Sequence, residues 1–249
     1  MATIGIFDSG SGGLSVYREI VKILPYERYL YFADKAHCPY GEKSVTYIQN
    51  RARAVTDILL GMGADIIVVA CNTATAAAIS LLREEYPAVS FVGMEPAVKP
   101  AALGTKTGVI GVLATAGTLK GSQYLKTKGR FEDDVRIVEH VGEGFVELVE
   151  NGILDGPRAY ETVKASLQPQ LDAGADRIVL GCTHYPFLRP VIEAVAGPGV
   201  QIIDPAPAVA RQTVRMLEKD CIPTDEGPFS IDLYFSGEPE SLQRIFALL

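Results

Sequence analysis

The stretch GADIIVVAC at residues 63–71 recurs with few changes as GADRIVLGC at residues 174–182. The apolar run in each copy indicates a buried β-strand, because strands covered on both faces are continuously apolar. A cysteine, Cys71 or Cys182, follows each strand where the chain turns into the next helix. In open α/β sheets, ligands bind outside these strand ends. The repeat therefore predicts one site with a thiol from each of two similar halves.

Short apolar segments alternate with amphipathic segments along the chain, which predicts an α/β fold with mostly parallel, helix-covered sheets. A second repeat, between residues 4–10 and 110–116, supports two related halves joined by a crossover at Glu95–Pro100. Strands are expected at residues 4–7, 29–32, 66–70, 90–93, 108–113, 135–140, 178–180, 201–203 and 231–235. Helices are expected to begin near Gly12, Ser44, Thr73, Thr115, Gly144, Gly156, Pro186 and Pro205, with a last short helix at 239–249.

The composition is ordinary for a soluble globular enzyme, with 48% hydrophobic and 21% charged residues. A net charge of −7 without a basic cluster argues against a nucleic-acid-binding protein. The chain start does not resemble a signal peptide, and no apolar run approaches the roughly 20 residues that span a bilayer. The four scattered cysteines fit neither a disulfide scaffold nor a paired zinc site. We therefore expect a cytoplasmic protein with reduced thiols, no metal and no membrane partner.

Polar residues follow four of the expected strands at the points where helices begin. Free N–H groups and the helix dipole favour an anion at such places. Each position taken alone is explained by N-capping, for which Ser, Thr, Asn and Asp are preferred. Four together, two of them with a cysteine, favour a ligand site. The four segments are Asp8–Ser9, Cys71–Thr73, Ala114–Thr115 and Cys182–His184.

The glycine-rich loop at residues 8–15 also has a nucleotide-binding interpretation. It contains Gly10-x-Gly12, and Asp34 follows the second strand at a distance suited to a ribose contact. However, Ser15 stands where the dinucleotide motif has its third glycine, and no Lys-Ser/Thr pair completes a P-loop. The glycines are equally explained by a tight turn and close helix packing. An NAD-dependent oxidoreductase is therefore a weak alternative.

The cysteines differ in what their positions predict. A helix start would lower the pKa of the Cys71 and Cys182 thiols from about 8.5. A thiolate beside a thiol is an acid–base pair near neutral pH. A disulfide between them is disfavoured in a reducing compartment. For Cys38 and Cys221 we expect small buried hydrophobic residues without a chemical role.

Other polar residues near these strand ends could take part in the chemistry. Asp8 could bond a substrate ammonium or help to deprotonate a thiol. His184 could carry a proton near neutral pH, and the alternative is a histidine that only satisfies a helix start. The loop Tyr40–Gly41, after Pro39, could close over the strand ends or form an ordinary turn.

Four segments together resemble the motifs of the glutamate racemase family. They are the glycine loop at 8–16, Pro-Tyr-Gly at 39–41, Cys-Asn-Thr-Ala-Thr at 71–75 and Gly-Cys-Thr-His-Tyr-Pro at 181–186. Their order and spacing match the family over essentially the whole chain, and the last motif is the most specific. The resemblance implies a cofactor-independent racemase that supplies D-glutamate for peptidoglycan.

The resemblance also implies the role of each site residue. Cys71 would deprotonate D-glutamate with help from Asp8, and Cys182 would deprotonate L-glutamate with help from His184 and Glu150. Gly142–Glu143 stands where the family usually has a Cys-Pro pair before the latter glutamate. Substrate contacts are implied for Asp8, Ser9, Tyr40, Gly41, Asn72, Thr73, Thr115, Thr183 and His184.

The family's fold implies two pseudo-symmetric, doubly wound α/β domains that face each other across the active-site cleft. Residues 1–96 with 206–249 would form the first, and residues 97–205 the second. Homodimers are frequent in the family, although the sequence shows no interface. Two alternatives keep the same fold: a racemase of aspartate or another 2-substituted acid, and a non-catalytic sensor that binds a small ligand without exchanging its α-proton.

Overall fold

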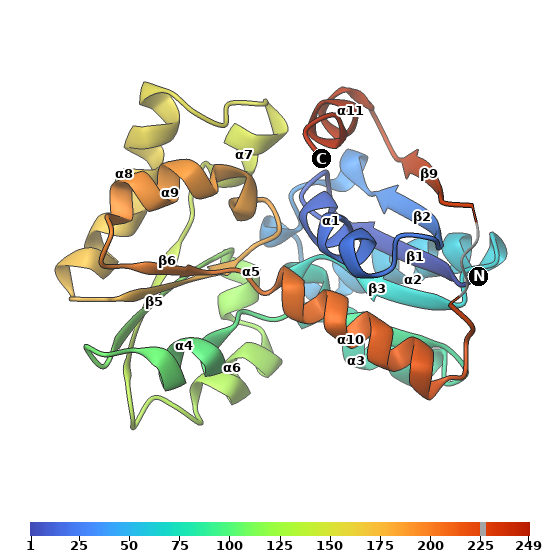
Figure 1. The fold of residues 1–249 in the computed structure, drawn as a ribbon, viewed down its shortest axis with the longest axis horizontal. Coiled ribbons are helices and arrows are strands. Elements are labelled where there is room, and N and C mark those ends of the chain that lie inside the picture. The colour runs from blue at the N-terminus through green and yellow to red at the C-terminus, as the bar shows by residue number, and fades with distance from the viewer. Residues whose placement is uncertain (225–227) are drawn as a thin grey trace.

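Two parallel β-sheets, each covered by helices on both faces, lie side by side in the computed structural model (Figure 1). The structure describes residues 1–224 and 228–249. This architecture confirms the expected α/β fold with parallel sheets. No helix in the described part of the chain is long and apolar enough to cross a membrane.

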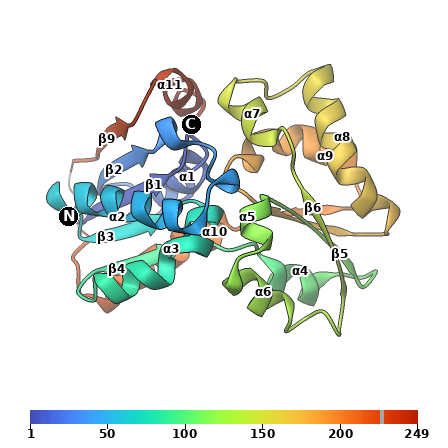
Figure 2. The same ribbon diagram turned by 180° about the vertical axis from the view of Figure 1, so that it is seen from behind.

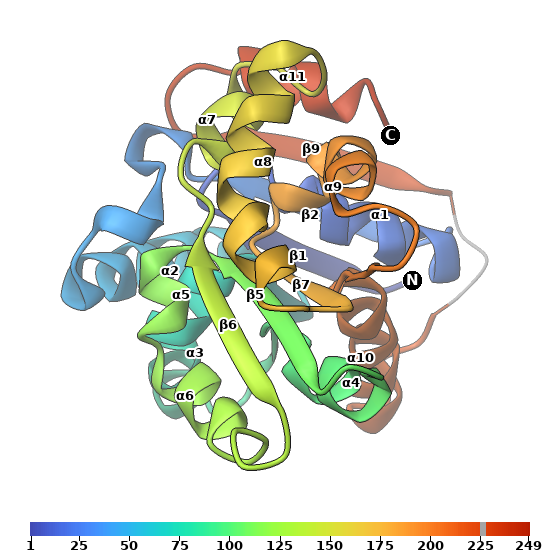
Figure 3. The same cartoon turned by 90° about the vertical axis from the view of Figure 1, so that its left-hand side faces the viewer.

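The first sheet has the strand order β4-β3-β1-β2-β9, and all of its neighbours are parallel. Its strands are β1 (Thr3–Asp8), β2 (Arg28–Ala33), β3 (Ile66–Val69), β4 (Ser90–Gly93) and β9 (Ser230–Phe235). The second sheet has the order β6-β5-β7-β8, also parallel, and Figure 3 shows β6 at its near edge. Its strands are β5 (Val109–Ala114), β6 (Arg136–Val141), β7 (Arg177–Gly181) and β8 (Gln201–Ile203).

Helices cover both faces of each sheet. On the first sheet, α1 (Leu14–Ile23) packs against α10 (Ala206–Lys219) on one side, and α2 (Val45–Gly61) against α3 (Asn72–Glu85) on the other (Figure 2). In Figure 1 the second sheet lies between two helices above it, α8 (Pro157–Asp172) and α9 (Arg189–Ala196), and two below it, α4 (Val98–Gly104) and α6 (Ser122–Lys128). The remaining α-helices of the described residues are α5 (Ala116–Leu119), α7 (Phe145–Glu150) and α11 (Glu240–Phe246).

The alternation of side chains along β1 explains why this strand lies in the middle of its sheet. Ile4 and Ile6 belong to the core formed with α1 and α10, whereas Phe7 belongs to the core formed with α2 and α3. All three side chains are fully buried. A strand that is apolar on both faces must be covered on both faces, as the sequence of residues 4–7 predicts.

All nine expected strands are present, but the helices differ from the expectations in three places. The expected crossover at Glu95–Pro100 contains the start of α4. The helix tolerates Pro100 there because this proline lies in the first turn, where a backbone N–H has no partner within the helix. The helix expected from Thr115 is divided into α5 and α6. The helix expected from Pro186 begins as the 3-10 turn η3 (Tyr185–Leu188), and the regular helix α9 starts only at Arg189.

Candidate active site

The carboxyl ends of the two sheets face each other and are joined by side-chain hydrogen bonds. The Thr183 hydroxyl, after β7, donates to Asp8 Oδ2 at the end of β1 over 2.9 Å. The hydroxyls of Thr73 and Thr115, which follow β3 and β5, lie 2.8 Å apart. The polar strand ends singled out in the sequence are therefore brought together at one place.

A closed cavity of about 20 Å³ lies between these strand ends. This volume is about what one water molecule needs, so the cavity is too small for a larger molecule as it stands. Both Cys71 and Cys182 line it, one from each sheet. Asp8 and Glu150 lie behind the lining and contact it through Thr183 and His184. The lining residues are Ser9, Pro39, Tyr40, Gly41, Cys71, Asn72, Thr73, Thr115, Val146, Cys182, Thr183 and His184.

Two lining residues, Pro39 and Val146, were not expected as site residues. Pro39 was visible only as part of the Pro-Tyr-Gly motif. Val146 lies in α7 and has no sequence signal, because an apolar residue in an amphipathic helix is most simply assigned to the core.

A larger hollow of about 760 Å³ shares Gly41 and Thr73 with the closed cavity. It lies between the first turns of α2 and α3 and the helices α5 and α6, and Lys43 and Lys120 are among its lining residues. Its size is within the range of small-molecule sites. It therefore offers a route by which a small anion could approach the two thiols.

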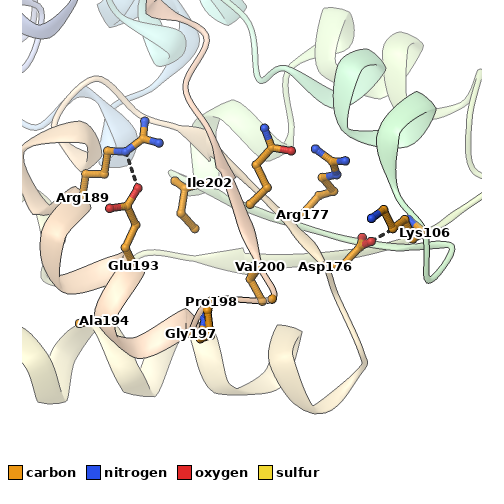
Figure 4. A pocket seen from close by; sticks show the side chains of 12 residues that line it. Lys106, Asp176, Arg177, Arg189, Glu193, Ala194, Gly197, Pro198, Val200 and Ile202 are labelled. Carbon is orange, nitrogen blue, oxygen red and sulfur yellow. Dashed lines mark hydrogen bonds and ion pairs between the residues drawn. The ribbon is translucent and has the colours of Figure 1, made fainter.

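A second large hollow, of about 750 Å³, lies at the opposite, amino-terminal ends of β7 and β8 (Figure 4). Several of the charged side chains drawn there form ion pairs or hydrogen bonds with neighbouring residues. Arg189 forms an ion pair with Glu193 over 2.7 Å, and Asp176 accepts the Lys106 backbone N–H over 2.6 Å. Among the described residues that line this hollow there is no thiol and no buried titratable side chain. It lacks the chemistry of the site between the sheets.

Cys71 forms the N-cap of α3, and its sulfur accepts the Ala74 N–H over 3.4 Å. Burial raises the pKa of this thiol well above its ordinary value, and the Asp8 carboxylate raises it further. Bonds from the Ala74 and Ser9 N–H groups lower the pKa by less. The expectation of a lowered pKa for Cys71 is therefore wrong, because burial outweighs the effect of the helix start. Burial also raises the pKa of Asp8, against the opposing effects of His184 and Thr183.

Cys182 is the first member of a row of three side chains. Its sulfur lies 3.8 Å from His184 Nδ1, and His184 Nε2 lies 2.7 Å from Glu150 Oε1. Burial lowers the pKa of His184, but its partners Cys182 and Glu150 raise the value well above normal. For Glu150 the effects have the opposite sign: burial raises its pKa, but the bonds from His184 and Lys35 outweigh burial and bring the pKa far below normal. The row therefore holds a buried imidazolium–carboxylate pair beside the sulfur.

The glycine loop lets this row approach the first sheet. A Cβ at Gly12 would lie 2.3 Å from His184 Nδ1, and a Cβ at Gly10 would lie 2.4 Å from Glu150 Oε1. The space beside the loop is thus filled by side chains of the other half of the molecule. Asp34 is fully buried and accepts two hydrogen bonds of 2.8 Å from Arg51. These contacts favour close packing over nucleotide binding as the reason for the glycines.

The buried amide of Asn72 points to a ligand. Its side chain lines the closed cavity, and no described residue bonds to either its oxygen or its nitrogen. Buried polar groups normally have hydrogen-bond partners, and one without a partner requires an explanation. A ligand with both donor and acceptor groups would satisfy both atoms of this amide.

One trio near the site has donor atoms that could hold a metal ion. The ligand atoms of Cys38, Glu150 and His184 lie within 4.8 Å of one another. Burial raises the pKa of Cys38 to about 12, which opposes the thiolate that zinc binds. The ammonium of Lys35 is already paired with the carboxylate. The arrangement suits hydrogen bonding better than metal ligation.

The two remaining cysteines are less buried than expected. Cys38 is half-buried beside Glu150 and His184. Cys221 is exposed, so its assignment to the core is wrong. It follows the end of α10 with a φ of 54°, a left-handed conformation of the kind that ends helices at the surface.

Comparisons with known proteins agree on one family. The family model described as Asp/Glu/Hydantoin racemase matches residues 4–213. A glutamate racemase of Ectopseudomonas mendocina is 47% identical over 248 residues, covering 100% of this chain and 94% of the relative. The crystal structure of a Bacillus anthracis glutamate racemase isoform is 33% identical, covers 98% of this chain and 92% of its own, and gives a TM-score of 0.88. Escherichia coli glutamate racemase in complex with L-glutamate and an activator is 35% identical, covers 99% and 94%, and gives a TM-score of 0.87.

Replacing Gly12 with alanine should destabilise the protein, because the new Cβ would displace His184 from its place beside Glu150. Overpacking of this kind costs about 1–3 kcal/mol in the free energy of unfolding. Urea denaturation followed by circular dichroism measures the loss. Gly61→Ala is the matched control, since its Cβ would meet nothing within 4 Å, and we expect no loss of stability there. A Gly12→Ala variant as stable as the Gly61→Ala variant would contradict the need for close approach.

Proposed function

The chain belongs to the glutamate racemases within the Asp/Glu/hydantoin racemase family, and from this premise we propose that it interconverts L- and D-glutamate with Cys71 and Cys182 and without a cofactor. The observation that carries the proposal is the cavity that both thiols line from opposite sheets. Racemisation removes the α-proton from one face of the substrate and returns a proton to the other. A group is therefore needed on each side of a planar, carbanion-like intermediate.

In the direction from L- to D-glutamate, the Cys182 thiolate takes the α-proton and the Cys71 thiol donates its own to the opposite face. The raised pKa of Cys71 suits this start, because it keeps that thiol protonated. In the reverse direction the two sulfurs exchange roles. When D-glutamate meets the enzyme with Cys71 still protonated, Asp8 accepts the Cys71 proton, for which its raised pKa is suited, and the imidazolium of His184 returns a proton to Cys182. Each turnover leaves the two thiols in the states that the opposite direction requires.

His184 and Glu150 support the Cys182 half of this cycle. An imidazolium 3.8 Å from the sulfur stabilises the thiolate by charge, and the buried Glu150 carboxylate keeps the imidazolium protonated. The row also fixes the orientation of the ring, so that Nδ1 faces the sulfur. This arrangement supports the helper role that the family resemblance implies for Glu150.

The lining side chains supply the groups that an amino acid with two carboxylates needs. The unpartnered Asn72 amide can both donate and accept, and hydroxyls are provided by Ser9, Thr73, Thr115 and Thr183. The start of α3 adds backbone N–H groups and a favourable dipole. Tyr40 is positioned by its hydroxyl bond to Asp34, and Gly41 lies beside Thr115. Orientation and hydrogen bonding at the developing charge would provide most of the rate acceleration.

Substrate entry requires the closed cavity to widen. We assign the motion to two domains, residues 1–96 with 206–249 and residues 97–205, separating at the Thr73–Thr115 and Asp8–Thr183 contacts. The hollow that shares Gly41 and Thr73 with the cavity provides the approach, and its lysines attract an anion to a chain of net charge −7. Closure then excludes water from the reaction. In the cell, we place this reaction in the cytoplasm, where it supplies D-glutamate for peptidoglycan.

Incubation with L-glutamate in D₂O tests the proposed function directly. We expect the circular-dichroism signal to decay to zero while deuterium appears at Cα of the D-glutamate product. Binding of glutamate without deuterium incorporation would favour a non-catalytic sensor. A higher kcat/KM for aspartate than for glutamate, measured in the same assay, would overturn the choice of substrate.

Single replacement of either thiol should abolish racemisation. Cys71→Ser and Cys182→Ser each remove the proton carrier of one face, and we expect kcat/KM to fall by about 10²- to 10⁴-fold, as for loss of a general acid or base. Since the two enantiomers have equal free energies, kcat/KM must fall equally in both directions. The exposed Cys221→Ser serves as the matched control and should retain wild-type activity. Near-normal turnover by either of the first two variants would refute the two-base mechanism.

Glu150→Gln should lower activity and shift its pH dependence. Burial lowers the pKa of His184, and Glu150 is one of the two partners that raise it, so the imidazolium of the variant loses its proton at lower pH. We expect the basic limb of the kcat/KM profile to move to lower pH and kcat to fall about 10- to 100-fold at neutral pH. Glu85→Gln, which breaks an exposed pair with Arg53, is the control and should leave the profile in place. If the basic limb of Glu150→Gln did not shift, Glu150 would not be the group that raises the pKa of His184.

A further inference from the structure

We propose that Lys35 is a positioning residue for the Cys182 half of the racemisation, acting through Glu150 and His184. The inference deepens the proposed function and rests on it. Lys35 is the first residue of the 3-10 turn η1 (Lys35–His37), directly after the strand end at Asp34. It belongs to none of the motifs that define the family resemblance. Its ammonium forms an ion pair with Glu150 Oε2 across the gap between the two sheets.

The two oxygens of Glu150 have separate partners. Oε1 lies 2.7 Å from His184 Nε2 and accepts hydrogen bonds of 2.9 Å from the Ser11 N–H and hydroxyl. Oε2 is held by Lys35. With one oxygen fixed from the first sheet, rotation of the carboxylate is restricted and the other oxygen stays directed at His184. Lys35 thereby sets the position of the ring that faces Cys182.

Burial makes this ion pair more consequential than those at the surface. The side chains of Lys35 and Glu150 are 23% and 10% exposed, whereas Lys22, in its pair with Glu19, is 58% exposed. An exposed pair contributes little, whereas removal of one partner from a largely buried pair has a much larger cost. Loss of Lys35 would therefore disturb Glu150 far more than loss of Lys22 disturbs Glu19.

The ammonium also changes the charge beside the reacting sulfur. Glu150 and a protonated His184 together are neutral, and Lys35 gives the group a net positive charge that favours a thiolate on Cys182. On the other side of the cavity, Asp8 bonds the hydroxyls of Thr183 and Ser9, and no described lysine or arginine forms an ion pair with it. The effect of Lys35 should thus fall on one thiol rather than on both.

This asymmetry provides a measurement that a purely structural role would not affect. Cys182 removes the α-proton of L-glutamate, and Cys71 removes that of D-glutamate. If loss of Lys35 slows only the Cys182 step, proton removal limits the rate more strongly with L-glutamate and less strongly with D-glutamate. The primary isotope effect with α-deuterated substrate should then rise for the L enantiomer and fall for the D enantiomer.

The experiment compares Lys35→Met, Lys35→Arg and the control Lys22→Met, with thermal unfolding recorded for each. We expect kcat of Lys35→Met to fall about tenfold, as for loss of a hydrogen bond to a charged group, with the opposed isotope effects described above. Lys35→Arg keeps the charge and should recover most of the activity. Lys22→Met should match the wild type.

A double variant tests whether Lys35 acts through Glu150. When one residue acts through another, the effects of the two replacements are not additive. Lys35→Met combined with Glu150→Gln should therefore be no slower than Glu150→Gln alone. Fully additive losses would overturn the proposal, and so would isotope effects that change equally for both enantiomers or a Lys35→Met variant with wild-type kcat. A wild-type protein that does not exchange the α-proton would instead refute the proposed function.

Discussion

The strands of a parallel sheet all end at the same edge of the sheet. In this protein, those edges of the two sheets lie against each other. That constraint brings polar side chains from distant parts of the sequence into one small, buried space. The contact between Asp8 and Thr183 forms only because the sheets meet end to end. Close approach in turn requires glycine: a side chain at Gly10 or Gly12 would occupy the positions of Glu150 and His184. The glycine loop is thus a consequence of how the sheets meet.

The duplicated backbone carries two different electrostatic environments. Beside Cys71, burial dominates, so the pKa of both the thiol and its neighbour Asp8 is raised. Beside Cys182, a protonated His184 faces the sulfur and is paired with Glu150. The proposed racemisation needs one thiol protonated and the other ionised at the start of each direction. In that proposal the asymmetry of charge supplies the difference, whereas the symmetry of the fold supplies only the opposed positions of the two sulfurs.

The sequence predicted the strands and the joint site well because both depend on local patterns. Continuous apolar runs and the cysteine that ends each of two repeats determine where strands stop, and parallel pairing then brings those ends together. The sequence was a poor guide where the outcome depends on burial by distant residues. Cys71 lies at a helix start, as expected, but its pKa is set by desolvation and by Asp8, which no local motif reports. Val146 appears as a core residue until the second sheet places α7 against the cavity.

Because the cavity is so small, its closure buries Cys71 and thereby affects the protonation of this thiol. Burial is the largest cause of the raised pKa of Cys71 and also of Asp8, so in the proposed mechanism water admitted when the sheets separate would ease ionisation of both groups. When the sheets close again, desolvation favours the neutral thiol on Cys71. In this proposal, the closure that excludes water therefore also keeps Cys71 protonated, so that it begins as the acid in the direction from L- to D-glutamate.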